Sequence, residues 1–485
     1  MSTLTVSTGS LRGRRDPDGV HFFGGVPFAD PPLGAQRFAP PRPPSPWTAT
    51  RDATAHGPGA RQAAAGPGRA LVDLGVPAES EDCLTVAVWT PTTDPAAALP
   101  VLVWVHGGAF VIGSSSVAVY DGGHLAARGA VVVGVNYRLG LQGWLRCDAL
   151  GATGNQGLAD QIAALEWVQR EITAFGGDPA NVTVFGESAG AASVAAHLAR
   201  GGDLPFRRAI LQSGAHNLTK SVEEADALGA KALEAVGGDA QRLTTMSADE
   251  LAQLQEQIAP RAAGVAFGPV RDGDLVPVDP LAAIAAGSAA GIPIVAGTNR
   301  DEMGFFWGRD ERFDVVSGEH LAGMLARWTD RPDAVLAAYR TARAGRGEPT
   351  DTRALAMALG ADWTFRVPVS QLADAQSAHA PVHSYRFDWP SPRYEGLVGA
   401  AHTLELPFVF GTFQRPECAE FVGDGPAAAA LSDVIATAWV DFARHGDPGW
   451  PAFDPAGRAT RIFDAECRVE SDPAGDERRA WAQAG

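Results

Sequence analysis

The chain has 485 residues, of which 46% are hydrophobic and 20% are charged, and its formal net charge is −17. This composition is ordinary for a globular protein with a large buried core. The acidic balance argues against binding to nucleic acid or to an anionic membrane surface. The N-terminus lacks the apolar segment of a signal peptide, and no apolar run reaches the roughly 18 residues of a membrane span.

The four cysteines give no sign of a metal centre. Cys83, Cys147, Cys418 and Cys467 are far apart and do not have the spacing of metal ligands. Their even number permits disulfides but requires none. We therefore expect a cytoplasmic, bacterial protein with reduced thiols, no metal and no organic cofactor.

The first third of the chain predicts strands. Residues 1–50 are typical of short strands and turns, and residues 51–80, which are rich in Gly and Ala and lack aromatic residues, predict a loop. Residues 84–89 alternate as a strand. The runs PVLVWV (100–105) and AVVVGV (130–135) are continuously apolar, which favours strands buried on both faces.

Further along, strand and helix signals alternate. An amphipathic helix is predicted over 158–175, and a Gly-Gly-Asp-Pro sequence ends it. The other predicted elements are strands at 182–185, 209–211, 293–296 and 382–389 and a helix at 432–442. This alternation predicts an α/β fold, with a large, mostly parallel sheet flanked by helices.

Two helical blocks, at about 217–265 and 303–378, interrupt the sheet pattern. A prior of about 150 residues per domain would give three domains. Because the motifs described below spread over one continuous chain, we instead expect a single domain, 1–485, in which both blocks are insertions.

The most informative stretch is VTVFGESAGAA, residues 182–192. An apolar, β-branched run stops at Gly186-Glu187-Ser188-Ala189-Gly190, and an alanine-rich helical stretch follows. A turn this tight favours glycine on either side of the serine. Strand, sharp turn and helix predict the nucleophile elbow of α/β-hydrolases, with Ser188 at its tip and at the positive end of the helix.

A nucleophilic serine needs a base and an acid, which follow it along the chain in this fold. His402 fits the base best, because it lies in a loop after a late strand; the other downstream candidates are in a strand, a turn or helices (His383, His445, His320 and His379). On spacing alone, either Asp301 or Glu302 could be the acid. We expect Glu187 to point away from the serine as a buried, hydrogen-bonded residue of the elbow.

The oxyanion hole is expected after the strand 100–105, in the glycine-rich turn that begins at His106. No side chains cover the backbone N–H groups of such a turn. Gly108 and Ala109, with Ala189 after the nucleophile, would supply three donors. The turn does not have the spacing of a phosphate-binding loop.

From about Phe23 to Trp450 the sequence resembles the type-B carboxylesterases, the group that includes bacterial para-nitrobenzyl esterases, animal carboxylesterases and cholinesterases. The motifs that carry the resemblance are FFGGVPFADPPLGAQRF, SEDCLTVAVW, VLVWVHGGAF, YDGGHLA, NYRLG, GNQGLADQ, FGGDPANVTVFGESAGAASV, RAILQSG, GTNRDE and GAAHTLELPFVFG.

The resemblance implies an α/β-hydrolase fold whose helical insertions form an active-site gorge. It implies a triad of Ser188, Glu302 and His402, which leaves Asp301 as a flanking residue. It also implies that the hydroxyl of Ser213 lies near the triad. Two structural ion pairs are implied as well, Arg37 with Glu81 and Arg138 with Asp160.

The sequence departs from the family pattern in three places. Ala109 replaces the third glycine of the frequent HGGGF motif, which keeps the backbone donor. Cys83 lacks the upstream cysteine with which it pairs in secreted animal members. Residues 51–80 lack the tryptophan that binds choline in cholinesterases, so a cholinesterase is not expected.

Together these features predict a serine carboxylesterase in which His402 is the base and activity falls as His402 becomes protonated, on the acid side of neutral. A carbamate, amide or lactone hydrolase with the same triad is the alternative, and a non-catalytic binding protein is a remote one. We expect a small-molecule ester substrate, no nucleic-acid or membrane partner, and a monomer or small homo-oligomer. Five aromatic residues could line the pocket: Phe110, Phe305, Phe306, Trp307 and Phe408.

Overall fold

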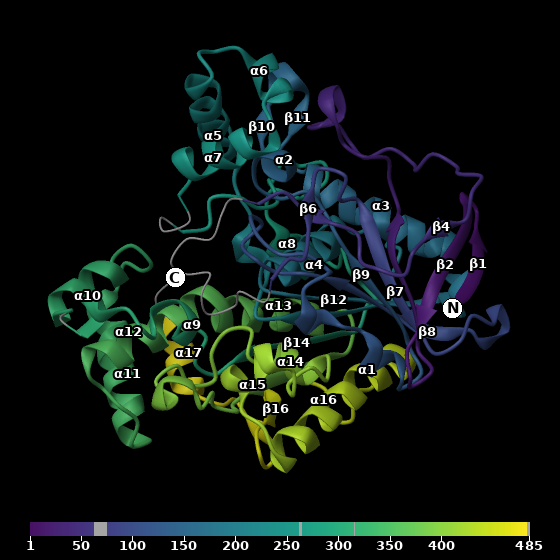
Figure 1. Ribbon diagram of the computed structural model, residues 1–485. Helices are drawn as coiled ribbons and strands as arrows, with labels where there is room; N and C mark the ends of the chain where they lie inside the picture. The colour runs from purple at the N-terminus through teal and green to yellow at the C-terminus, as the bar shows by residue number, and fades with distance from the viewer. Residues whose placement is uncertain (63–74, 261–263, 315, 483–485) are drawn as a thin grey trace.

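The computed structural model describes residues 1–62, 75–260, 264–314 and 316–482. At its centre these residues form a sheet of 13 strands in the order β1-β2-β3-β7-β9-β8-β12-β13-β14-β15-β16-β17, with β4 paired to β2 (Figure 1). From β9 to β16 neighbouring strands are parallel, whereas the pairings β1–β2, β2–β3, β3–β7, β7–β9 and β16–β17 are antiparallel. The strands are β1 (Ser2–Val6), β2 (Gly9–Arg15), β3 (His21–Pro27), β4 (Arg51–Asp52), β7 (Thr85–Thr90), β8 (Leu99–Val105), β9 (Val131–Val135), β12 (Gly177–Glu187), β13 (Arg208–Gln212), β14 (Ile294–Asn299), β15 (Val382–Phe387), β16 (Ala459–Phe463) and β17 (Arg468–Ser471).

The continuous apolar runs are buried on both faces of the sheet, as predicted. Along β8, Val101 and Val103 join one core cluster, whereas Leu102 and Trp104 join the other. This follows from the two-residue period of a strand, which sends successive side chains to opposite faces. A hydrophobic residue is therefore needed at every position of the strand, so no polar alternation is seen in its sequence.

Helices cover both faces of the sheet. The first core cluster includes residues of α3 (Gln156–Glu171), α4 (Ala189–Arg200), α8 (Pro280–Ala285) and α13 (Val367–Ser377). The second includes residues of α1 (Gly123–Ala126), α14 (Leu406–Val409) and α16 (Pro426–His445). The expected α/β class, with a mostly parallel sheet between helices, is thus confirmed.

The two predicted helical blocks form separate groups in Figure 1. The first contains α5 (Val222–Ala235), α6 (Ala240–Thr245) and α7 (Ala248–Ile258), and residues 261–263 of this block are outside the described part of the chain. Both α5 and α7 begin with a capping box, in which a serine and a glutamate bond each other's backbone N–H groups. The second contains α9 (Gly304–Trp307), α10 (Gly318–Leu325), α11 (Pro332–Gly345), α12 (Thr352–Ala361) and a π-helical turn, Asp362–Arg366.

Several element boundaries differ from the prediction. The helix predicted over 158–175 is α3 followed by a 3₁₀ turn, Ile172–Phe175, and the helix at 432–442 extends to the whole of α16. The strand predicted at 382–389 ends at Phe387, and Pro390, which lacks an N–H, prevents the pairing from continuing further along the chain. The loop predicted over 51–80 contains β4 and the two-residue strands β5 (Gly59–Ala60) and β6 (Glu79–Ser80), and its residues 63–74 lie outside the described ranges.

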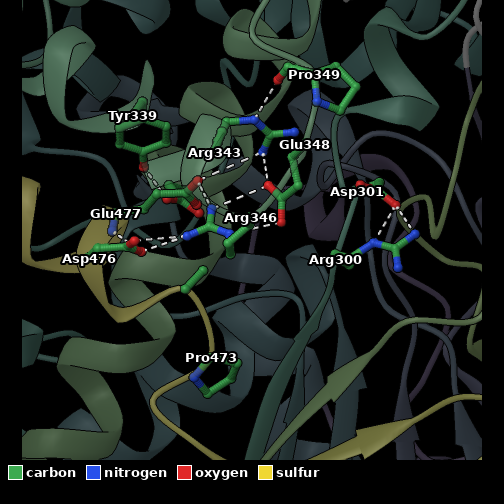
Figure 2. Close-up of polar contacts among 12 residues, drawn as sticks. Arg300, Asp301, Tyr339, Arg343, Arg346, Glu348, Pro349, Pro473, Asp476 and Glu477 are labelled. Atoms are coloured by element: carbon green, nitrogen blue, oxygen red, sulfur yellow. Dashed lines mark hydrogen bonds and ion pairs between the residues drawn. The ribbon is translucent and has the colours of Figure 1, made fainter. Parts of the chain in front are cut away.

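The C-terminal helix α17 (Gly475–Ala482), which the sequence pattern did not predict, is fastened to α11 by charged groups (Figure 2). Arg346 bonds Glu348, Asp476 and Glu477. The indole N–H of Trp481 donates to the hydroxyl of Tyr339 over 2.6 Å. The end of the chain is thereby tied to the second helical block.

Two ion pairs, one buried and one partly buried, join distant parts of the chain, as the family resemblance implied. Arg37 Nε lies 2.7 Å from Glu81 Oε1, and an Arg138 guanidinium nitrogen lies 2.7 Å from Asp160 Oδ1. All four cysteine thiols are free. Among the described helices, none combines the length and apolar character needed to span a bilayer.

Candidate active site

Ser188 occupies the sharp turn between β12 and α4. Its φ of 56° and ψ of −121° are rare for a residue with a side chain. A Cβ placed on Gly186 would lie 2.6 Å from the carbonyl carbon of Gly190, and one on Gly190 would overlap the carbonyl oxygen of Val105 at the end of β8. The two glycines are therefore required by close backbone approach, and together they leave Ser188 at the tip of the turn.

Glu302 and His402 come together from two loops 100 residues apart. Glu302 lies just beyond β14, and its Oε2 is 2.6 Å from His402 Nδ1. Both side chains are buried. The backbone N–H of His402 also donates to the carbonyl oxygen of Glu302, over 3.3 Å, which fixes the two loops against each other.

Of the two candidate acids, only Glu302 contacts the histidine. Asp301 pairs with Arg300 near the surface, over 2.9 Å (Figure 2). Its carboxylate also accepts the N–H of Ala400. Asp301 thus stabilises the loop that leads to His402, whereas the carboxylate of Glu302 faces the imidazole.

Glu187 is a buried residue of the elbow, as expected, and its carboxylate faces His402, a contact that the sequence did not predict. Glu187 is buried, and its Oε1 lies 3.0 Å from His402 Nε2. Room for the carboxylate comes from Gly107, where a Cβ would lie only 2.6 Å from Glu187 Oε2. Among the described residues, Glu187 is the charged group nearest to Nε2, as an ion-pair contact, and no hydrogen bond joins His402 to the hydroxyl of Ser188.

The imidazole of His402 therefore lies between two carboxylates. Burial opposes its charged form, but the negative charges of Glu187 and Glu302 outweigh burial and raise the pKa of His402 well above 6.5. Burial also raises the pKa of Glu187, although the contact with His402 works in the opposite direction. The site stabilises a positive charge on the histidine.

The loop that begins at Gly107 presents unpaired backbone donors. Gly108, Ala109 and Phe110 have successive φ values of 113°, 53° and 64°. Within the described ranges, the N–H groups of Gly108, Ala109 and Ala189 donate to no protein acceptor. Because Ala109 adopts a left-handed φ that glycine would adopt without strain, the preference of the family for glycine here has a physical reason.

Ser213 follows β13 and lies beneath the elbow. It is fully buried, with a φ of 50°, and its N–H donates to the carbonyl oxygen of Gly297 over 2.8 Å. Its hydroxyl has no hydrogen-bonding partner among the described residues. The backbone of Ser213 thus links the end of β13 to β14, whereas its hydroxyl makes no hydrogen bond with the described residues.

Three phenylalanine rings surround the imidazole. The ring centroids of Phe305, Phe306 and Phe365 lie 6.0, 5.2 and 4.6 Å from that of His402. Phe306 is 48% exposed, so it lies on the solvent side of this group of three rings. Phe365 is not among the pocket residues predicted from the sequence, because its place beside His402 depends on the π-helical turn, which has no clear sequence signal.

The other three aromatic candidates do not contact His402. Phe110 and Phe408 are fully buried: Phe110 packs on Trp144, and Phe408 packs on Phe387. Trp307 packs in a small cluster with Met303. In the part of the chain that the structure describes, no group of three His, Cys, Asp or Glu side chains could hold a metal ion.

A mostly parallel sheet between helices, a serine at a strand–helix turn and a buried His–Glu pair are the features of a hydrolase with the α/β-hydrolase fold. The chain belongs to the carboxylesterase family, whose model matches residues 1–468. It is 40% identical to the para-nitrobenzyl esterase of Bacillus subtilis (strain 168) over 98% of this chain and 97% of that protein. It is 35% identical to the phenmedipham hydrolase of Pseudarthrobacter oxydans over 93% of each chain.

A solved structure gives the same result. The carboxylesterase of Geobacillus stearothermophilus superimposes with a TM-score of 0.88 at 38% identity, covering 99% of this chain and all of that one. The family and fold implied by the sequence motifs are confirmed.

Proposed function

We propose that the protein is a serine carboxylesterase that forms an acyl-enzyme on Ser188. One observation carries this proposal: the buried His402–Glu302 pair, with 2.6 Å between Nδ1 and Oε2, reaches the strained turn of Ser188, because His402 Nε2 lies 3.0 Å from the carboxylate of the neighbouring Glu187. The unpaired N–H groups of Gly108, Ala109 and Ala189 support it, because they could receive the negative charge of a tetrahedral intermediate.

In the proposed mechanism, His402 Nε2 accepts the hydroxyl proton of Ser188 as the oxygen attacks the ester carbonyl. Nε2 has to release Glu187 to do so. Glu302 holds Nδ1 and stabilises the imidazolium, which then protonates the departing alcohol. Water deprotonated by His402 attacks the acyl-enzyme and regenerates Ser188. Catalytic hydrogen bonds are often long or poorly aligned before substrate binds, so the resting contact with Glu187 is compatible with this role.

Replacement of the nucleophile tests the proposal. We expect Ser188→Ala to lower kcat for p-nitrophenyl acetate by about 10⁶-fold, as removal of a serine nucleophile does in serine proteases. A fluorophosphonate probe should label the unmodified protein at Ser188 and leave the variant unlabelled. Hydrolysis by the variant at the rate of the unmodified protein would show that the assignment is wrong.

A carbamate is the second candidate substrate class. It is favoured by the similarity to the phenmedipham hydrolase, since phenmedipham is a carbamate. The triad chemistry is the same for both classes, and the pocket walls select between them. Comparing kcat/KM for acyl esters of graded length, a carbamate and an anilide would separate the candidates.

We also propose that the enzyme acts on a small-molecule substrate, has no nucleic-acid or membrane partner, and is a monomer or small homo-oligomer. A cytoplasmic location is supported by the four free thiols.

A further inference from the structure

Asn299 makes three hydrogen bonds at the point where the acid and histidine loops meet. It is the last residue of β14 and is 2% exposed. Its backbone N–H donates to Glu302 Oε1 over 2.8 Å. Its side-chain Nδ2 donates to the carbonyl oxygen of Ala401 over 2.6 Å and to Glu405 Oε2 over 2.7 Å. One residue therefore holds the acid, the residue before His402, and a third buried carboxylate.

Further hydrogen bonds connect Glu405 to Ser188. The second oxygen of Glu405 accepts from Gln212 Nε2 over 3.0 Å. Gln212 is the last residue of β13, and its backbone carbonyl oxygen accepts the N–H of Ser188 over 2.8 Å. The ends of β12, β13 and β14 are thus linked behind Ser188, Glu302 and His402 by a buried network, formed by Asn299, Glu405 and Gln212.

Each member of the network is held on more than one side. The side-chain oxygen of Gln212 accepts the indole N–H of Trp439, over 3.1 Å, from α16. Both oxygens of Glu405 accept amide N–H groups.

Burial, together with the charges of Glu187 and Glu302, raises the pKa of Glu405 to about 8. Apart from the side-chain oxygen of Asn299, which has no partner among the described residues, the side-chain polar atoms of Asn299, Glu405 and Gln212 are all hydrogen-bonded, and a buried network of this kind is costly to disrupt.

We propose that Asn299 is a positioning residue of the esterase, whose side-chain amide fixes the loop of His402 against the carboxylate of Glu302. The inference rests on the proposed triad. The backbone N–H of residue 299 would still orient Glu302 after loss of the side chain, but the Ala401–His402 segment would lose its anchor. Small displacements of a catalytic group can cost about 10²-fold in rate.

The test is Asn299→Ala, with kcat, KM and the pH profile measured on folded protein. We expect kcat to fall by about 10- to 100-fold with little change in KM, because the substrate-binding walls are untouched. A looser His402–Glu302 contact stabilises the imidazolium less, so the acid limb of kcat/KM should move to lower pH. Asn299→Asp, which keeps the shape but replaces the donor by an acceptor, should also lower kcat.

A matched control is Asn155→Ala. Asn155 is equally buried, and its side chain also makes three hydrogen bonds, to Val270 twice and to Asp272, but none to the triad. We expect this variant to lose stability and to keep the kcat and acid limb of the unmodified enzyme.

A double-mutant cycle with Glu302→Gln separates positioning from a general structural effect. If Asn299 acts by setting the His402–Glu302 contact, its removal should cost little once Glu302 is replaced. Additive losses, an unchanged kcat and acid limb in Asn299→Ala, or failure of both Asn299 variants to fold would overturn the proposal. Activity retained by Ser188→Ala would instead overturn the proposed function itself.

Discussion

His402 lies between two carboxylates, and this arrangement sets the expected pH dependence. The neutral imidazole is the active base, so activity rises as pH passes through the pKa of His402. Glu187 and Glu302 raise that pKa above 6.5. The acid limb of kcat/KM should therefore lie above the ordinary histidine range, higher than the sequence pattern alone predicts.

Glu187→Gln tests the contribution of the second carboxylate. The amide keeps the shape of the side chain and removes its negative charge, so the imidazolium loses one stabilising partner. We expect the acid limb of kcat/KM to move to lower pH, measured with p-nitrophenyl acetate between about pH 5 and 9. Glu302 still holds Nδ1 in this variant. An acid limb at the same pH as in the unmodified enzyme would contradict the electrostatic role of Glu187.

At the residue scale, the sequence predicted the turn at Ser188 better than it predicted the contacts between distant side chains. Ser188 is placed by local geometry, because the glycines around it are forced by the turn. The Glu187–His402 contact joins residues more than 200 positions apart and depends on the space left by Gly107. No local pattern reports such a contact. The same holds for Asn299, whose partners Ala401 and Glu405 come from a different loop.

At the element scale, the elbow depends on the close approach of α4 to β8. The position of Gly190 leaves no space for a methyl group, because a Cβ there would overlap the carbonyl oxygen of Val105. We expect Gly190→Ala to displace the start of α4, with a loss of stability of a few kcal/mol and loss of esterase activity. Thermal unfolding and the rate of fluorophosphonate labelling measure both effects.

Gly323→Ala is the matched control for this substitution. Gly323 lies inside α10, and, apart from its chain neighbours and the adjacent backbone of its own helix, no atom lies within 4 Å of its would-be Cβ. Alanine in a helix is favoured over glycine by about 0.5–1 kcal/mol, so this variant should be slightly more stable and fully active. A Gly190→Ala protein with normal stability and labelling would refute the requirement for glycine at the elbow.

Elements with a strong, uniform pattern were predicted, and those stabilised mainly by tertiary contacts were not. The strands β8 and β9 are apolar at every position because both of their faces are covered. In contrast, β17 is mostly exposed at the edge of the sheet. The helix α17 is short and polar, and it is held through Arg346 and Trp481 rather than by its own periodicity. Local sequence carries little information about elements of this kind.

At the scale of the whole molecule, Arg138 joins three distant segments. Its guanidinium bonds both oxygens of Asp160 on α3, over 2.8 and 2.7 Å. It also donates to the carbonyl oxygens of Arg37 and Ala39, over 3.0 and 2.7 Å, in the N-terminal region. The side chains of Arg138 and Asp160 are 1% and 0% exposed, so water does not compensate for a missing partner.

Asp160→Ala should therefore destabilise the protein by about 3–5 kcal/mol, because it leaves the Arg138 cation buried without its carboxylate. The comparison is Asp52→Ala, which breaks an exposed pair with Arg12 whose side chains are 51% and 57% exposed. Water and salt already screen that pair, so its loss should leave the unfolding midpoint almost unchanged. Chemical unfolding of both variants measures the difference. Equal midpoints would mean that backbone carbonyls alone suffice to hold Arg138, and that Asp160 does not join α3 to the N-terminal region energetically.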